Sequence, residues 1–139
     1  MDIQNLEYGH ILALDFTKLR QVSQCGDILP VVVQHVDTGA VLIVAYTNQD
    51  AFEESLRQNI AIFWSTSRNK LWIKGATSGD YLDLVDIRVN CEQNALLYRV
   101  RPRTSGVCHT KNAQGHAHET CFYRRVTSGA TVERIQTNH

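Results

Sequence analysis

The fold is decided by the stretch Pro30-Val31-Val32-Val33-Gln34-His35-Val36-Asp37-Thr38-Gly39-Ala40-Val41-Leu42-Ile43-Val44-Ala45-Tyr46. Two runs rich in β-branched residues flank a turn-forming triplet, which is typical of two strands joined by a tight turn. Gly39 occupies the turn position that needs freedom in φ. We therefore predict a β-hairpin over residues 30–46 as the first unit of a sheet.

One helix and further strands are predicted after this hairpin. Thr47 or Asn48 can cap a helix over residues 49–58, in which the apolar residues share one face, and Asn59 can end it. Before the hairpin, Asp15 or Thr17 could cap a short helix through Val22. Further strands are predicted over residues 61–65, 70–74, 81–90, 95–100 and 122–126.

Alternation within residues 81–90 places the apolar side chains Val85, Ile87 and Val89 on one side of the strand. By the same parity we expect the thiol of Cys91 to point inward. The segment from Thr127 onward is polar, and we expect it to be loose. The prediction is a single α+β domain over residues 1–139, rich in sheet and with one clear helix.

Composition narrows the class of function. The chain has 139 residues, of which 43% are hydrophobic, and its 14 basic and 14 acidic residues give a net charge of zero. We therefore expect neither nucleic acid nor an anionic membrane as the main partner. No run approaches the roughly 18 apolar residues of a membrane span, and the N-terminus lacks the pattern of a signal peptide. A cytoplasmic location follows as an expectation.

Cysteines and histidines gather in the second half of the chain. Four cysteines in a cytosolic protein are more typical of thiols or metal ligands than of disulfides, and we expect Cys25 to be incidental. Cys91, Cys108 and Cys121 could bind zinc, although no Cys-x2-Cys spacing is present. The alternative is that these cysteines pack as small buried hydrophobic residues. The polar sequence around Cys108 and Cys121 favours the metal, and zinc with an open position would support hydrolysis.

Histidines accompany these cysteines. His109 directly follows Cys108, so a metal ligand would lie beside a group that can move protons near neutral pH. We expect His116 and His118 to be exposed loop residues, and Glu119 to be a surface charge.

A candidate substrate pocket lies between residues 64 and 79. Hydroxyl-bearing and glycine-rich turns can bind phosphate through backbone N–H groups, and Arg68 and Lys74 could add positive charge. Trp64 and Trp72 offer planes for a base or a sugar. The alternative is a hairpin with core tryptophans and solvated charges. The polar and glycine positions are Ser65, Ser67, Gly75, Thr77, Ser78 and Gly79.

Three blocks of the chain resemble the phosphoribosyl-AMP cyclohydrolase family, whose members open the adenine ring of phosphoribosyl-AMP by hydrolysis in histidine biosynthesis. The similarity runs from about Leu14 to Arg125. The blocks are Leu14-Asp15-Phe16 with the hairpin through Tyr46, Trp64-Ser65-x-Ser67-Arg68-x-x-Leu71-Trp72-x-Lys74-Gly75-x-Thr77-Ser78-Gly79, and Cys108-His109-Thr110 with Cys121-Phe122-Tyr123-Arg124.

The resemblance implies an intertwined homodimer with zinc at the subunit interface. The zinc ligands would be Cys91 of one chain and Cys108 and Cys121 of the other. His109, as a proton shuttle, and Arg68 would be the catalytic residues. The residues implied to bind the nucleotide substrate are Trp64, Ser65, Ser67, Trp72, Lys74, Gly75, Thr77, Ser78 and Gly79.

Departures from the family pattern concern a second metal. The family's magnesium motif is Asp-Cys-Asp-x-Asp, but here the residues are Asn90, Glu92 and Asn94 around Cys91. Mg²⁺ relies on anionic oxygen ligands, so a magnesium site is doubtful. Thr66 also replaces an arginine common in the family, and the segment 111–119 is longer than usual.

Three hypotheses remain open at this point. The first is a cyclohydrolase that uses zinc and little or no magnesium. The second is a paralogue acting on another purine-like nucleotide. The third is a zinc-stabilised dimeric binding module without hydrolase activity, in which four protein ligands would close the coordination shell.

Overall fold

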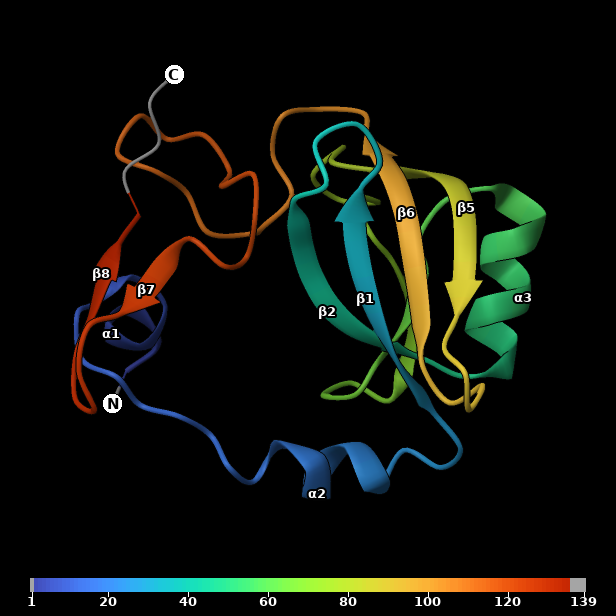
Figure 1. Ribbon diagram of the computed structural model, residues 1–139, viewed down its shortest axis with the longest axis horizontal. Helices are drawn as coiled ribbons and strands as arrows, with labels where there is room; N and C mark the ends of the chain where they lie inside the picture. Colours follow the sequence, from blue (N-terminus) through green and yellow to red (C-terminus); the bar gives the residue numbers. More distant parts are fainter. Residues whose placement is uncertain (1, 136–139) are drawn as a thin grey trace.

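The computed structural model describes residues 2–135 and contains a four-stranded sheet in the order β2-β1-β6-β5 (Figure 1). The strands are β1 (Leu29–His35), β2 (Val41–Thr47), β5 (Leu82–Val89) and β6 (Leu96–Pro102). β1 pairs antiparallel with β2, with Val32 opposite Val44, so the predicted hairpin is confirmed. β1 and β6 are parallel, whereas β5 and β6 are antiparallel.

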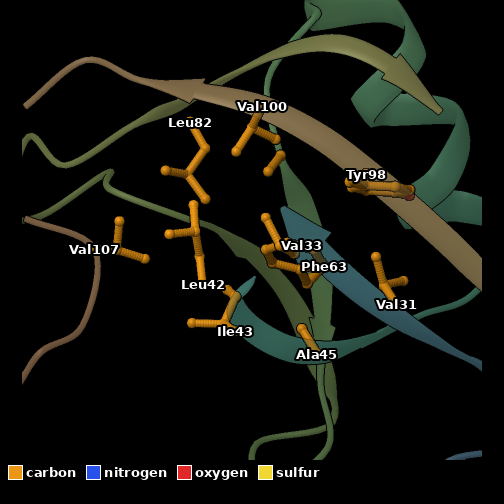
Figure 2. Packing of buried hydrophobic residues seen from close by; sticks show 11 residues of the cluster. Val31, Val33, Leu42, Ile43, Ala45, Phe63, Leu82, Tyr98, Val100 and Val107 are labelled. Carbon is orange, nitrogen blue, oxygen red and sulfur yellow. The ribbon is translucent and has the colours of Figure 1, made fainter. Parts of the chain in front are cut away.

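A second hairpin and a helix cover one face of this sheet. The hairpin consists of β3 (Ile62–Ser65) and β4 (Lys70–Ile73), and the helix is α3 (Gln49–Gln58). As predicted, Asn48 caps the helix by accepting a hydrogen bond from Ala51 N at 2.9 Å. Asn59 ends it in the left-handed conformation with φ of 57°. Figure 2 shows the core between the layers, which includes Val31, Val33, Leu42, Phe63, Leu82, Tyr98, Val100 and Val107.

Alternation is interrupted within β5, and the prediction for Cys91 in the turn after it is wrong. The pairing register of β5 with β6 shifts between Leu84 and Asp86, so one extra residue enters the strand. Leu82 is buried and Ile87 packs against the core, although the two have opposite parity. Val85 is consequently 48% exposed. Cys91 is exposed rather than pointing inward for a different reason, because β5 ends at Val89 and Cys91 lies in the turn that follows.

Short helices precede the sheet. The helix predicted near Asp15 to Val22 is present as α2 (Lys18–Ser23), although Thr17 at its cap position makes no capping bond through its side chain. The Asp15 carboxylate instead accepts a hydrogen bond from Thr17 N at 2.9 Å. A further helix, α1 (Ile3–Tyr8), was not predicted. Because α1 and α2 have six residues each, α3 is the one long helix of residues 2–135.

The segment after Thr127 is ordered rather than loose. β7 (Arg124–Val126) pairs with β8 (Val132–Arg134), and Val132 N donates to His10 O at 2.9 Å. Figure 1 shows this small sheet beside α1. The expectation of a loose tail is therefore wrong for residues 127–135, while residues 136–139 lie outside the described part of the chain. Among the described residues, no helix combines the length and apolar character needed to cross a membrane.

Candidate functional site

The thiols of Cys108 and Cys121 are brought together at the edge of the sheet. Cys108 follows Val107, which is buried in the core, and Cys121 N donates to Leu42 O at 2.8 Å. The thiol of Cys121 hydrogen-bonds to Cys108, and this contact is the main cause that lowers the pKa of Cys108 from 9.0 to about 5. The same contact raises the pKa of Cys121. The pair therefore favours a thiolate at Cys108 with Cys121 as its donor.

A hydroxyl and an imidazole continue this arrangement. Thr110 Oγ1 is buried and donates to Cys108 Sγ at 3.0 Å, and His118 Nδ1 lies 2.9 Å from the same hydroxyl. The His118 ring stacks on Tyr123, with 3.7 Å between ring centroids and 6° between the planes. Burial lowers the pKa of His118. The expectation of an exposed His118 is therefore wrong, whereas His116 and Glu119 are exposed as expected.

The helix α1 lies against the loop that follows Cys108. His109, whose side chain is 74% exposed, is hydrogen-bonded through Nε2 to the carboxylate of Glu7. Two further contacts hold α1 in place: the Tyr123 hydroxyl donates to Glu7 O, and Lys111 N donates to Tyr8 Oη at 2.9 Å. Sequence reasoning missed Glu7, because a contact across 102 residues leaves no signal in local spacing.

Cys91 is not part of this cluster within one chain. It is exposed in the β5–β6 turn, and Figure 1 shows that turn at the end of the sheet away from the loop of residues 105–123. Within the described residues 2–135, no group of three or more His, Cys, Asp or Glu side chains is placed to hold a metal ion. One chain thus unites two of the three predicted zinc ligands.

The positions of the family's magnesium motif form a closed hydrogen-bonded turn. Asn90 Oδ1 accepts from Asn94 N and Ala95 N, both at 2.9 Å, and Asn90 Nδ2 donates to Asn94 Oδ1 at 2.7 Å. Asn94 Nδ2 donates to the carboxylate of Glu92 at 3.0 Å. The side-chain oxygens of Asn90, Glu92 and Asn94, which would have to bind the cation, already accept hydrogen bonds from N–H groups. Only one of these three side chains, Glu92, is a carboxylate. This donor set does not fit Mg²⁺.

Lys74 and Gly75 build the inner side of the predicted substrate block. Lys74 is 7% exposed, its Nζ donates to Asp80 O at 3.2 Å, and burial lowers its pKa. The negative charge of Cys108 opposes this effect and raises the pKa of Lys74, so the ammonium group interacts electrostatically with the sulfur pair. Gly75 has φ of 92°, and an added Cβ would lie 2.4 Å from Tyr81 N, so a side chain there has no room.

The remaining residues of this block line the β3–β4 hairpin. Trp72 is 40% exposed, and its ring lies 5.6 Å from that of Phe63. Trp64 Nε1 donates to Asn69 Oδ1 at 3.0 Å, which fixes the indole at the turn. The outer positions are all exposed to solvent: Ser67, Arg68, Thr77, Ser78 and Gly79. These five positions are accessible to a ligand. Neither Trp64 nor Trp72 is a fully buried core residue.

A lysine from α2 reaches the same hairpin. Lys18 Nζ donates to Thr66 Oγ1 at 2.9 Å, and Cys25 Sγ donates to Thr66 O at 3.4 Å. A cation therefore lies at the position where the sequence lacks the family's arginine. Spacing could not reveal this contact, because Lys18 lies 48 residues before Thr66.

Comparisons with known proteins agree with these blocks. The family model for phosphoribosyl-AMP cyclohydrolase matches residues 43–123. A phosphoribosyl-AMP cyclohydrolase of Caulobacter vibrioides is 40% identical over 136 residues, covering 97% of this chain and 88% of the relative. The corresponding protein of Hyphomonas neptunium is 39% identical, covering 73% of this chain and 72% of its own length. That of Chlorobaculum parvum is 37% identical, covering 79% and 75%.

Proposed function

The chain belongs to the phosphoribosyl-AMP cyclohydrolase family, and from this premise we propose how its residues carry out the reaction. It is a hydrolase of histidine biosynthesis, and its substrate is phosphoribosyl-AMP. Water adds to the adenine ring carbon next to the phosphoribosylated nitrogen, the C–N bond breaks, and the departing nitrogen takes a proton. The product is the formimino-aminoimidazole carboxamide ribotide. A nucleotide substrate of this kind is consistent with a cytoplasmic enzyme.

Zinc is the metal that suits the sulfur pair. Cys108 favours the thiolate form that zinc binds, and Thr110 donates a hydrogen bond to its sulfur. Cys121 would release its proton to solvent when zinc binds the pair. A third sulfur, Cys91, is exposed at a distant turn of the same chain. The proposal is that Cys91 of a second copy completes the site, so that the enzyme is a homodimer with zinc at the interface. The observation that carries this proposal is the pairing of Cys108 with Cys121.

Each protein group then has a task in the reaction. Zinc, when bound, supplies Lewis-acid activation of water. His109 lies next to Cys108 in the chain, and its bond to Glu7 orients the imidazole for proton transfer to the departing nitrogen. Lys74 and Arg68 bind phosphate groups together with the hydroxyls of the block. The exposed Trp72 and the half-buried Trp64 provide aromatic surface for the base or ribose.

Magnesium has no role in this proposal. The side-chain amides of Asn90 and Asn94 hydrogen-bond to each other within the turn. Asn94 Nδ2 also donates to the carboxylate of Glu92, so one of its oxygens already has a hydrogen-bond partner. We expect turnover to depend on zinc and to be insensitive to Mg²⁺.

The experiment is a metal analysis of the purified protein together with turnover of phosphoribosyl-AMP across separate zinc and magnesium titrations. Zinc bound at one ion per chain and turnover without added magnesium support the proposal. A strict magnesium requirement would contradict the metal assignment. Failure to restore growth of a histidine auxotroph that lacks the cyclohydrolase would point instead to another purine-like nucleotide as substrate.

A further inference from the structure

The loop between Lys111 and Glu119 folds back on itself instead of extending into solvent. Lys111 and Ala117 form an antiparallel bridge, and Asn112 N donates to His116 O at 2.8 Å. The Asn112 side chain accepts from Gln114 N and His116 N, both at 3.0 Å. These bonds make the loop a compact unit, so the residue that leaves it, His118, has a defined position.

Backbone contacts join that residue directly to the cysteine segment. His118 O accepts from Val107 N at 2.9 Å and from Cys108 N at 3.0 Å, and His118 N donates to Thr110 O at 2.9 Å. Close packing reinforces the junction, because a Cβ added at Gly106 would lie 2.5 Å from Ala117 Cβ. The main chain of His118 is therefore held against the segment that carries Cys108.

Side chains extend this junction into an ordered chain of hydrogen bonds. The Thr110 hydroxyl has a single proton, and it donates that proton to Cys108 Sγ at 3.0 Å. Toward His118 Nδ1, at 2.9 Å, the same oxygen must then act as acceptor, so Nδ1 carries the imidazole proton. Thr110 is 3% exposed, which limits competition from water. The sequence of donors runs from His118 through Thr110 to Cys108.

We propose that His118 is a positioning residue that acts through Thr110 to keep a hydroxyl proton directed at the sulfur of Cys108. The stack on Tyr123 fixes the plane of the His118 imidazole. Because Nδ1–H donates to Thr110 Oγ1, the Thr110 hydroxyl cannot donate its own proton to the imidazole. Cys108 then always meets a donor on this side. Groups that orient metal ligands in this way contribute to metal affinity. The consequence for zinc depends on the function proposed above, whereas the hydrogen-bond chain itself does not.

Three substitutions at position 118 separate the hydrogen bond from the packing. H118F retains an aromatic ring to stack on Tyr123 but has no Nδ1 donor. H118N places an amide nitrogen near the position of Nδ1, and H118Q places it near Nε2 instead. H116F, at an exposed position of the same loop, is the matched control.

The first measurement is nitrogen NMR of the histidine rings in the zinc-free, full-length protein. The expected result is the Nδ1–H tautomer at His118, together with a change in that signal in T110V. An Nε2–H tautomer in the wild-type protein would overturn the proposal. This readout requires neither zinc nor turnover, so it gives an answer even if the zinc assignment fails.

The second measurement is zinc affinity by competition with a chromophoric chelator. H118F and H118Q are expected to bind zinc about 10-fold more weakly than wild type, and H118N and H116F to remain within about 3-fold of it. Equal affinity for H118F and wild type, or equal loss for H118N and H118Q, would overturn the positioning role. If H118F does not fold, the comparison of H118N with H118Q decides the question. Absence of zinc binding by the wild-type protein would contradict the proposed function and leave the NMR result to judge the hydrogen-bond chain.

Discussion

The four-stranded sheet and the segment of residues 105–123 are stabilised in different ways. The sheet is built from backbone ladders between strands and from alternating apolar side chains such as Val31 and Val33, which are fully buried. Residues 105–123 contain no strand and are held by individual bonds to other segments. The sheet is stabilised by many equivalent hydrogen bonds and apolar contacts. Each hydrogen bond of residues 105–123, in contrast, joins a particular pair of groups that no other pair replaces.

The edge of the sheet connects the two regions. β2 is an outer strand, so its outward carbonyl groups have no neighbouring strand to pair with. Thr120 Oγ1 donates to Val41 O at 2.8 Å, and Cys121 N donates to Leu42 O. The sheet therefore provides a rigid edge on which the cysteine pair is assembled. Substitutions in the sheet should alter stability, and substitutions in residues 105–123 should alter chemistry.

The largest expected effect is that of C108S. A serine oxygen is a weaker zinc ligand than a thiolate, so we expect zinc binding and turnover to be lost while the sheet remains folded. Metal analysis, turnover and circular dichroism measure the three quantities. C25S, which changes a cysteine beside Thr66, is the control and should retain activity. If C108S unfolds, residues 105–123 also determine stability, and the proposed division between the two regions is wrong.

The next effect concerns the core. Phe63 lies in β3 and is fully buried against the four-stranded sheet, so F63A should lower the free energy of unfolding by about 3–5 kcal/mol. Urea unfolding measures this change. Zinc affinity per folded molecule should stay near the wild-type value, because the sulfur pair lies outside the cavity created. A loss of zinc affinity with little change in stability would contradict the proposed division.

A smaller effect concerns the pH dependence of the zinc-free protein. The pKa of Cys108 is lowered to about 5, so thiolate absorbance should appear with a midpoint near pH 5 in a C25S/C91S background. Since the folded state binds fewer protons than the unfolded state between this value and the ordinary 9.0, this group makes stability rise with pH across that window. The stabilisation is lost as the pH falls through 5. A midpoint near 9 would show that Cys121 and Thr110 do not act on Cys108.

The smallest effect is that of E7Q. Glutamine keeps the length of the side chain but replaces a carboxylate with an amide, so His109 loses its charged partner. We expect kcat to fall about 10-fold, because the proton shuttle is less well oriented. Zinc content should not change, and E133Q, in the pair with Arg125, is the control. A loss of zinc in E7Q would indicate that α1 supports the metal site rather than the histidine.

Local patterns predicted most of the sheet and the central helix. The hairpin of residues 30–46 and the Asn48 cap depend on neighbours in the sequence, and both were predicted correctly. Alternation failed at Val85, where a bulge adds one residue, so Leu82 and Leu84 face the core before the bulge and Ile87 faces it after the bulge. Cys91 has the same parity as Ile87 but lies in an exposed turn beyond the end of β5, and alternation alone could not show where the strand ends.

The wrong predictions for His118 and for residues 127–135 have a common cause. Both segments are polar, and polar segments with weak periodicity look like loose loops. His118 is instead held by Thr110 and Tyr123, and β8 is held by β7 and by His10 O. Hydrogen bonds and ring contacts between individual polar groups leave no periodic signal.

The amino-acid sequence alone determined the α+β class, the positions of the main strands along the chain and the residue types of the cyclohydrolase family, because burial periods and motif spacing are local properties. Only the tertiary structure decided that Cys91 is exposed in the β5–β6 turn, that Glu7 reaches His109 and that His118 hydrogen-bonds to Thr110. Glu7 and His109 lie 102 residues apart, and Cys121 is held against β2 through Leu42 O, so these positions depend on the folded chain and leave no pattern in neighbouring residues.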